Sequence, residues 1–308
     1  MRGDDRKLHP HYPGAEEVDA WVESIFRLND ETPCKAEVVQ ATGFRETFGT
    51  PQFGKHFRYV RFEPQGMEPF YAYWQPAHAG PAPLLVHVPG YGAEMSAHPE
   101  LVAAGYNVLH INPLGYVTPD GPQSRLRTEN DWPVLPDTIA SAGQAGYRIW
   151  LANCVAAIEW AMKQPSVQPN RVSFFGTSQG GGGALLLGSM YRDRGARAVA
   201  ADEPFLTHFP LADARGAYRR APIGLERTSP EAGWRGLGFV DTMNHARRLT
   251  LPVLLTAGEA DDICPPETIQ ALFERLPGTR SLTMLSGEGH GYTSVFVPLA
   301  SAWFRLYA

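Results

Sequence analysis

Ser178 stands in the pattern G-T-S-Q-G at positions 176–180, which could place a reactive hydroxyl at the apex of a tight turn. A β-forming run at 171–175 precedes the pattern and an apolar run at 184–187 follows it, so a strand, a turn and a helix are predicted in that order. This order is typical of a nucleophile elbow, a strained turn that presents a serine hydroxyl above the edge of a sheet. The flanking glycines fit, because a Cβ atom there would collide with the neighbouring strand or helix. A chain with 31 glycines also produces such patterns by chance, but the predicted elements around this one favour the functional interpretation.

A serine hydroxyl is a weak nucleophile near neutral pH, so this chemistry requires a histidine base and an acid that orients the base. Both are expected after Ser178 in the chain, the acid first. Asp261 is the predicted acid, with Asp262 as its rival, because both follow the carboxyl end of a buried-type strand at 252–257. His290 is the predicted base, since it lies in a glycine-rich loop after the next predicted strand. These residues predict acyl transfer through a serine nucleophile.

The oxyanion that forms during acyl transfer needs backbone N–H donors that are already in position. The N–H of Gln179, the residue after the nucleophile, is the first predicted donor. The second is expected from the loop after the strand at 83–88, where Tyr91 lies between two glycines. Without that role, Tyr91 would be an ordinary turn residue.

Ten histidines occur in the chain, and a histidine in a loop is more often a solvated side chain than a catalyst. His208 and His245 precede Asp261 in the sequence, which counts against either of them as the base. No spacing of His, Cys, Asp and Glu typical of a metal site occurs, and no G-x-G-x-x-G pattern follows the first parallel strand. The chemistry is therefore predicted to need no metal and no cofactor.

An α/β fold is predicted from the order of the elements that must position these residues. The predicted strands are 57–62, 70–74, 83–88, 107–111, 171–175, 198–201, 252–257 and 281–285. The first two form an antiparallel pair, and the others alternate with helices such as 151–162 and 269–276. This alternation predicts a mostly parallel central sheet with an antiparallel start and helices on both faces.

One domain with insertions is expected for a chain of 308 residues. Residues 1–55 are interpreted as a helical or irregular extension packed on the core, with one helix at 18–28, and residues 56–308 as the sheet domain. Two long segments rich in Pro, Gly and Arg, at 113–144 and 205–246, leave the carboxyl ends of strands. Long loops at that edge tend to bind ligands, so they are interpreted as pocket walls, with ordinary surface insertions as the alternative.

Composition restricts the kinds of partner that the chain can have. A net charge of −5 leaves no basic surface for nucleic acid or anionic lipid, and no apolar run reaches the roughly 20 residues that span a membrane. No secretory leader is visible at the N-terminus. Three cysteines are too few for a disulfide framework, and each is interpreted as a small buried or half-buried hydrophobe. A small-molecule substrate and a cytoplasmic location are expected.

Five segments resemble one known family. G-T-S-Q-G-G at 176–181 is similar to its G-x-S-Q-G-G motif, E-P-F-L-T-H-F at 203–209 to P-F-L-C-H-F, and F-V-D-T-M-N at 239–244 to Y-F-D-x-x-N. G-E-A-D-D-I-C-P-P at 258–266 resembles G-L-x-D-x-x-C-P-P, and G-Y at 90–91 resembles the oxyanion loop. The family is that of acetyl xylan esterases and cephalosporin C deacetylases, carbohydrate esterase family 7, within the α/β-hydrolases.

This resemblance implies the α/β-hydrolase fold, favours Asp261 over Asp262, and implies a serine esterase that removes small acyl groups, acetyl first, from carbohydrate-like or small-molecule alcohols. Phe205 is a candidate for substrate binding, and so is Tyr116, in the L-G-Y that stands at 114–116 where the family has R-G-Q. His290 is followed by glycine where the family has glutamate. A homo-oligomer, as the family forms, is a possible assembly for this chain that its sequence does not decide.

Other functions fit the same scaffold. A broader carboxylesterase, a thioesterase or a peptidase would use the same three residues with a pocket of a different shape. A non-catalytic binding protein on a hydrolase fold is the remaining alternative, and the intact Ser178, Asp261 and His290 count against it.

Overall fold

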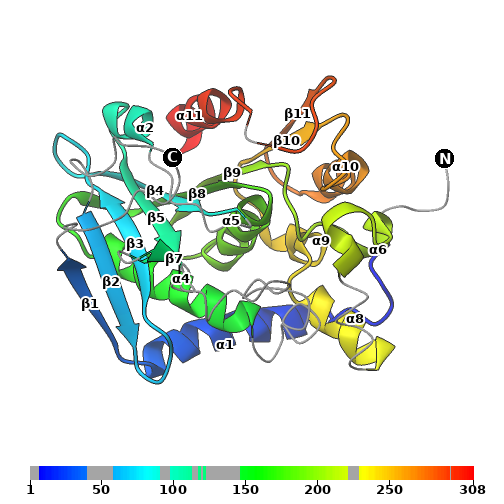
Figure 1. The fold of residues 1–308 in the computed structure, drawn as a ribbon, viewed down its shortest axis with the longest axis horizontal. Coiled ribbons are helices and arrows are strands. Elements are labelled where there is room, and N and C mark those ends of the chain that lie inside the picture. The colour runs from blue at the N-terminus through cyan, green and yellow to red at the C-terminus, as the bar shows by residue number, and fades with distance from the viewer. Residues whose placement is uncertain are drawn as a thin grey trace.

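The computed structural model describes residues 7–39, 58–90, 98–112, 117–118, 121–122, 146–220, 229–291 and 293–308. A nine-stranded sheet runs through the centre of this part of the chain, in the order β1-β2-β3-β5-β4-β8-β9-β10-β11 (Figure 1). Its strands are β1 Cys34–Val39, β2 Arg58–Pro64, β3 Phe70–Gln75, β4 Ala82–Val88, β5 Asn107–Asn112, β8 Val167–Thr177, β9 Ala196–Asp202, β10 Val253–Gly258 and β11 Arg280–Leu285.

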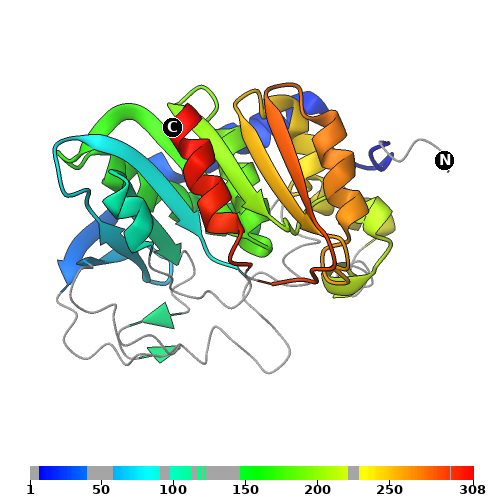
Figure 2. The same ribbon diagram turned by 90° about the horizontal axis from the view of Figure 1, so that it is seen from above.

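The pairing within the sheet confirms the predicted mixture of directions. The neighbouring strands in the order β1-β2-β3-β5 pair antiparallel. The neighbouring strands in the order β5-β4-β8-β9-β10-β11 pair parallel. Parallel pairing brings the carboxyl ends of β8, β9, β10 and β11 to the same edge of the sheet, which Figure 2 shows from above. The loops that leave this edge carry the predicted site residues.

Strand β1 is an edge strand that the sequence pattern does not predict. It pairs antiparallel with β2, with Cys34 opposite Pro64. Three of its positions are half-buried, and Lys35, Glu37 and Val38 are exposed. The strand thus joins part of the 1–55 segment to the sheet.

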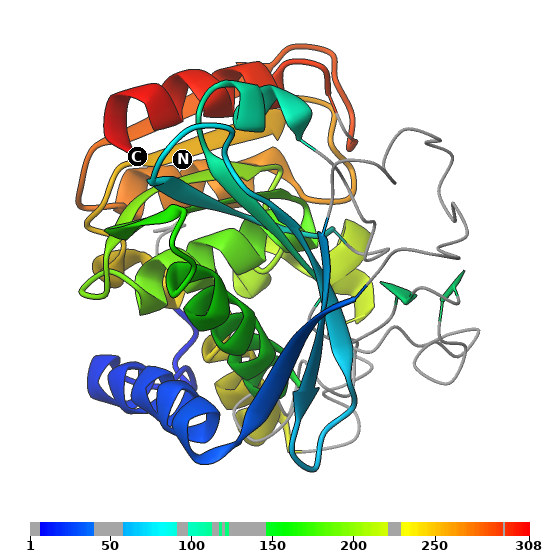
Figure 3. The ribbon, with the colours of Figure 1, turned by 90° about the vertical axis from the view of Figure 1, so that its left-hand side faces the viewer.

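Helices cover both faces of the sheet, as predicted (Figure 3). The larger core lies under α1 (Ala15–Glu31), α4 (Tyr147–Met162), α5 (Gln179–Met190) and α10 (Pro266–Arg275), and the smaller one under α2 (Pro99–Ala103) and α11 (Phe296–Tyr307). Consecutive strand residues alternate between the two cores: in β8, Phe174 belongs to the larger core and Phe175 to the smaller. None of the helices in the described part of the chain combines the length and apolarity that crossing a bilayer requires.

Helix α1 carries the apolar face that its sequence period predicts. The side chains on this face are buried: Val18, Trp21, Val22, Ile25 and Phe26. The helix packs against α4, so the N-terminal segment contributes to the larger core.

The described residues of the 205–246 segment, 205–220 and 229–246, include short helices beside the carboxyl edge of the sheet. They are α6 Phe209–Ala212, the 3₁₀ helix η3 Gly216–Arg220, α8 Pro230–Gly238 and α9 Thr242–His245, and the 3₁₀ helix η4 Ala246–Arg248 follows them. Asp241 holds the segment together, since its carboxylate accepts from the N–H groups of His208 and Phe209 at 2.8 and 2.9 Å and from the Tyr12 hydroxyl at 2.7 Å. Of the 113–144 segment, only the paired strands β6 (Val117–Thr118) and β7 (Gly121–Pro122) are among the described residues.

Candidate active site

Ser178 lies at the turn between β8 and α5 with a left-handed backbone, φ 59° and ψ −121°. A non-glycine residue adopts this conformation only at a cost of about 1–3 kcal/mol, so the surrounding structure must impose it. The flanking glycines let the turn form, because a Cβ atom on Gly176 would lie 2.5 Å from the Val88 carbonyl oxygen and one on Gly180 would also collide with that oxygen. The predicted reason for both glycines is confirmed.

Backbone hydrogen bonds fix the position of Ser178 against the neighbouring strand β9. The Ser178 N–H donates to the Asp202 carbonyl at 2.8 Å, and the Ser178 carbonyl accepts from the Phe205 N–H at 2.9 Å. The turn is therefore held by the last residue of β9 and by the loop that follows this strand.

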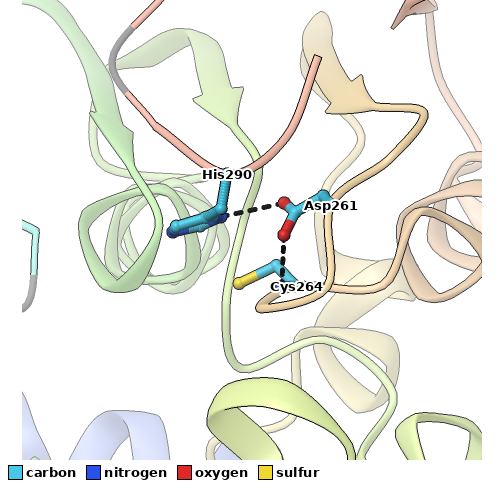
Figure 4. A group of neighbouring side chains, drawn as sticks. All are labelled: Asp261, Cys264 and His290. Atoms are coloured by element: carbon cyan, nitrogen blue, oxygen red, sulfur yellow. Dashed lines mark hydrogen bonds and ion pairs between the residues drawn. The ribbon is translucent and has the colours of Figure 1, made fainter. Parts of the chain in front are cut away.

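The structure brings Ser178, Asp261 and His290 together, although they leave three different strands. The His290 Nε2 atom lies 3.0 Å from the Ser178 Oγ atom, and the His290 Nδ1 atom lies 2.8 Å from Oδ2 of Asp261. Figure 4 shows the edge of the His290 ring directed at the Asp261 carboxylate. This chain of two hydrogen bonds can move a proton from the serine hydroxyl to the imidazole.

The Asp261 carboxylate is held by its own turn. Its Oδ1 atom accepts from the N–H groups of Ile263 and Cys264, each at 2.8 Å, which leaves Oδ2 for His290. The Asp261 side chain is fully buried, whereas Asp262 is exposed. The acid that faces the histidine is thus Asp261.

The electrostatic surroundings of His290 favour its protonated form. Burial alone would lower the pKa of the imidazole, but the hydrogen bond to Asp261 and the negative charges of Asp261, Glu203 and Asp202 outweigh burial and raise the pKa above 6.5. The site therefore stabilises an imidazolium, the species formed when the histidine takes a proton from serine.

His245 belongs to the core instead of this site. Its Nδ1 atom lies 2.8 Å from the Ser189 hydroxyl and its Nε2 atom 2.9 Å from the Phe239 carbonyl oxygen. Burial lowers its pKa to about 4, so the ring stays neutral in the core. Position in the chain and position in the structure thus both count against His245 as the base.

One of the two predicted oxyanion donors can be placed. Gln179 is the first residue of α5, where backbone N–H groups have no partner within the helix, and its side-chain amide donates to the Tyr147 hydroxyl at 3.0 Å. Tyr91 lies outside the described residues, which reach Gly90 in this loop. Val88 and Gly176 are paired in register, so the loop starts beside the serine turn. Tyr91 as the second donor stays a prediction.

Of the two residues predicted to bind substrate, the structure describes Phe205 but not Tyr116. Phe205 is only 5% exposed, and its ring packs at 4.7 Å between centroids against Tyr218 and at 5.9 Å against Phe209. It therefore stabilises the aromatic cluster next to the serine turn, and a contact with substrate stays a prediction. Tyr116 lies outside the described residues.

Two acids at the end of β9, Asp202 and Glu203, also belong to the site. Neither was among the predicted site residues. The Asp202 carboxylate accepts from the hydroxyls of Thr177, at 2.9 Å, and Thr256, and burial raises its pKa. The fully buried Glu203 lies with Oε2 at 3.3 Å from Nδ1 of His290. Two successive acids at the carboxyl end of a parallel strand are the sequence signal that points to them.

Cys264 completes the surroundings of the acid. Its thiol, the Asp261 carboxylate and the His290 ring have atoms within 4.8 Å of one another (Figure 4), a set of residue types that can bind a metal ion. In this site Asp261 and His290 use the facing atoms for the bond to each other. Burial raises the pKa of the Cys264 thiol, which keeps it neutral. All three cysteines are free, and Cys154 and Cys264 are buried as predicted.

A mostly parallel sheet with a serine at a strand-to-helix turn, and an acid and a histidine after later strands, defines the α/β-hydrolase fold. The chain is similar in structure to an acetyl xylan esterase from Paenibacillus sp. R4, with a TM-score of 0.77, 22% identity and 100% of both chains covered. It is also similar to acetyl xylan esterase 1 from Thermoanaerobacterium sp. JW/SL YS485, with a TM-score of 0.74 and 22% identity over 100% of this chain and 99% of the other. These two likenesses establish the fold.

The family follows from the sequence. Residues 55–306 match the model of the acetyl xylan esterase (AXE1) family, and the chain belongs to this family. A stretch of 143 residues is 29% identical to acetyl esterase Axe7A of Xylanibacter ruminicola. The stretch is 46% of this chain and 32% of that protein, so the chain spans about a third of the length of this curated relative.

Proposed function

We propose that this protein is a serine esterase that removes small acyl groups, acetyl first, from carbohydrate-like or other small-molecule alcohols. The observation that carries the proposal is the unbroken chain of hydrogen bonds from the Ser178 hydroxyl through His290 to Asp261, at 3.0 and 2.8 Å. Membership of the acetyl xylan esterase family supports the ester substrate and the acetyl group.

In the first half of the reaction, the Ser178 oxygen attacks the acyl carbon while Nε2 of His290 takes the hydroxyl proton. Asp261 keeps the other proton on Nδ1, so that the lone pair of Nε2 faces the serine. The oxyanion would accept hydrogen bonds from the predicted donors Gln179 and Tyr91. The bond to the alcohol oxygen then breaks, and His290 gives its proton to the leaving alcohol.

In the second half, water attacks the acyl group on Ser178, and His290 takes a proton from that water. The bond between the serine oxygen and the acyl carbon breaks, and the proton on Nε2 returns to the serine oxygen. The products are the free alcohol and the carboxylic acid, and no redox change or cofactor enters the balance.

The acyl preference is tested with p-nitrophenyl esters of increasing chain length and with acetylated xylan as a carbohydrate substrate. We expect the highest kcat/KM for acetate. Since one methylene changes binding in an apolar pocket by only about 1–3 kcal/mol, strong rejection of long chains requires a wall that closes the acyl site. If octanoate or butyrate equals or exceeds acetate, the protein is a broader carboxylesterase and the acetyl preference is wrong.

A further inference from the structure

Glu203 brings a second carboxylate to the histidine of the site. Its Oε2 atom lies 3.3 Å from Nδ1 of His290, the same ring nitrogen that lies 2.8 Å from Asp261. The two carboxylates come from different strands, since Glu203 follows β9 and Asp261 follows β10. The shorter distance makes Asp261 the principal acceptor of the Nδ1 proton, with Glu203 within reach of the same proton.

The backbone holds Glu203 in place for this contact. Glu203 has a left-handed φ of 43°, which a non-glycine residue adopts only when its surroundings impose it. Its N–H donates to the Thr256 carbonyl at 3.1 Å, and its Oε2 atom accepts from the Gly291 N–H at 2.8 Å. The glutamate is thereby tied to β10 and to the residue after the histidine.

The other oxygen of Glu203 has no assigned partner. Oε1 is buried, and among the residues that the structure describes it has no hydrogen-bond partner. Burying a carboxylate with one unsatisfied oxygen is costly, and the contacts that offset this cost, the Gly291 N–H and the His290 ring, both lie at Oε2. Burial, together with the charges of Asp202 and Asp261, raises the pKa of Glu203 to about 7, whereas the Gly291 N–H and the charge of His290 favour the ionised form. Among the titratable neighbours, only His290 can offset the charge of the Glu203 carboxylate.

We propose that Glu203 is a second positioning acid of this active site, which holds the Nδ1 proton of His290 together with Asp261 and takes over as its acceptor when Asp261 is lost. This inference rests on the proposed serine esterase function. It concerns the tautomer of the ring, because a carboxylate at Nδ1 keeps the proton there and leaves Nε2 free to accept the serine proton.

The rival explanation is that Glu203 only fixes the loop that carries His290, through the Gly291 N–H. The two explanations differ when Asp261 is replaced. In Asp261→Asn the amide N–H₂ group faces Nδ1 and favours the wrong tautomer. A carboxylate at position 203 would oppose that change, whereas a mere loop tether would not.

The test is a double-mutant cycle of Glu203→Gln and Asp261→Asn, with kcat/KM for an acetate ester as the readout and thermal melting as the control for folding. Glutamine keeps the shape and an oxygen for the Gly291 N–H. Alone, Glu203→Gln is expected to lower kcat/KM by less than about 5-fold. In the Asp261→Asn background, we expect the same substitution to lower kcat/KM by at least about 10-fold more, because the effects of two residues that act on the same ring are not additive. An equal or smaller loss in that background overturns the proposal.

A second readout does not depend on turnover or on a variant of Glu203. In Asp261→Ala, the Nδ1 proton of His290 should keep a low-field, hydrogen-bonded proton NMR signal at a pH where the ring is protonated, because Glu203 still accepts it. The His290→Ala variant identifies the signal. Disappearance of the signal in a folded Asp261→Ala protein overturns the proposal. Failure of the serine esterase function itself would appear separately, as unchanged activity of Ser178→Ala in the same assay.

Discussion

The Nδ1 atom of His290 lies 2.8 Å from Oδ2 of Asp261, although 29 positions separate the two residues in the chain. Parallel pairing of β10 with β11 makes this contact possible, since Gly258 and Leu285, the last residues of the two strands, are in register. The acid and the base thus leave adjacent strand ends and meet in front of the serine turn.

The acid can be identified by replacing each of two neighbouring aspartates. Asp261→Asn should lower kcat/KM by about 10²–10⁴-fold, because the amide no longer holds the imidazole in the required tautomer. Asp262→Asn is the matched control: the residue is exposed, so we expect a change of less than about 3-fold. The measurement is steady-state hydrolysis of an acetate ester. A larger loss in Asp262→Asn than in Asp261→Asn would contradict the assignment of the acid.

The activity should rise with pH through the pKa of His290. The negative charges beside the ring outweigh burial and raise this pKa above 6.5, and only the neutral ring can accept the serine proton. The neutral fraction is therefore lost as the pH falls through the raised pKa, and kcat/KM should fall with it. The measurement is kcat/KM for a non-ionisable acetate ester at a series of pH values from acid to alkaline. A profile that is flat across this range is incompatible with His290 as the base.

Chelators should leave the activity unchanged. The atoms of Asp261 and His290 that face each other are engaged in their mutual hydrogen bond, and the proposed reaction needs only the serine, the imidazole and the oxyanion donors. The measurement is hydrolysis after incubation with EDTA and dialysis, with added Zn²⁺ as the control. Loss of activity that a divalent ion restores would mean that the group of Asp261, Cys264 and His290 binds a metal.

The packing of the serine turn can be tested at one glycine. In Gly180→Ala the new Cβ atom would overlap the Val88 carbonyl oxygen, a backbone atom that cannot move without shifting β4. Overpacking of this kind destabilises a protein by about 1–3 kcal/mol or more, and here it would also displace Ser178. We expect a lower midpoint of urea unfolding together with reduced kcat. An alanine variant with unchanged stability and activity would show that the turn is not closely packed.

The sequence predicts the sheet and the three central residues of the site because both depend on local patterns and chain order. Ser178, Asp261 and His290 each follow a strand with a clear apolar pattern, and parallel strands bring such positions to one edge. The contact between Gln179 and Tyr147 could not be predicted, since it joins residues 32 positions apart with no shared pattern. The sequence places Glu203 at a strand end, but its contact with His290 could not be predicted, because the contact depends on a left-handed backbone that favours glycine. Strand β1 has no fully buried apolar residue, since Lys35, Glu37 and Val38 are exposed and its other positions are only half-buried.

Covalent labelling tests most directly whether Ser178 is the nucleophile. The reagent is diethyl p-nitrophenyl phosphate, which reacts with an activated serine, and the readouts are intact mass measurement and peptide mapping. We expect one diethylphosphoryl group per chain, located on the peptide with Ser178, and a loss of esterase activity in proportion to labelling. Ser178→Ala should remain folded, unlabelled and inactive. Full activity in the labelled protein, inactivation through another residue, or substantial turnover by Ser178→Ala would contradict the claim that Ser178 is the nucleophile.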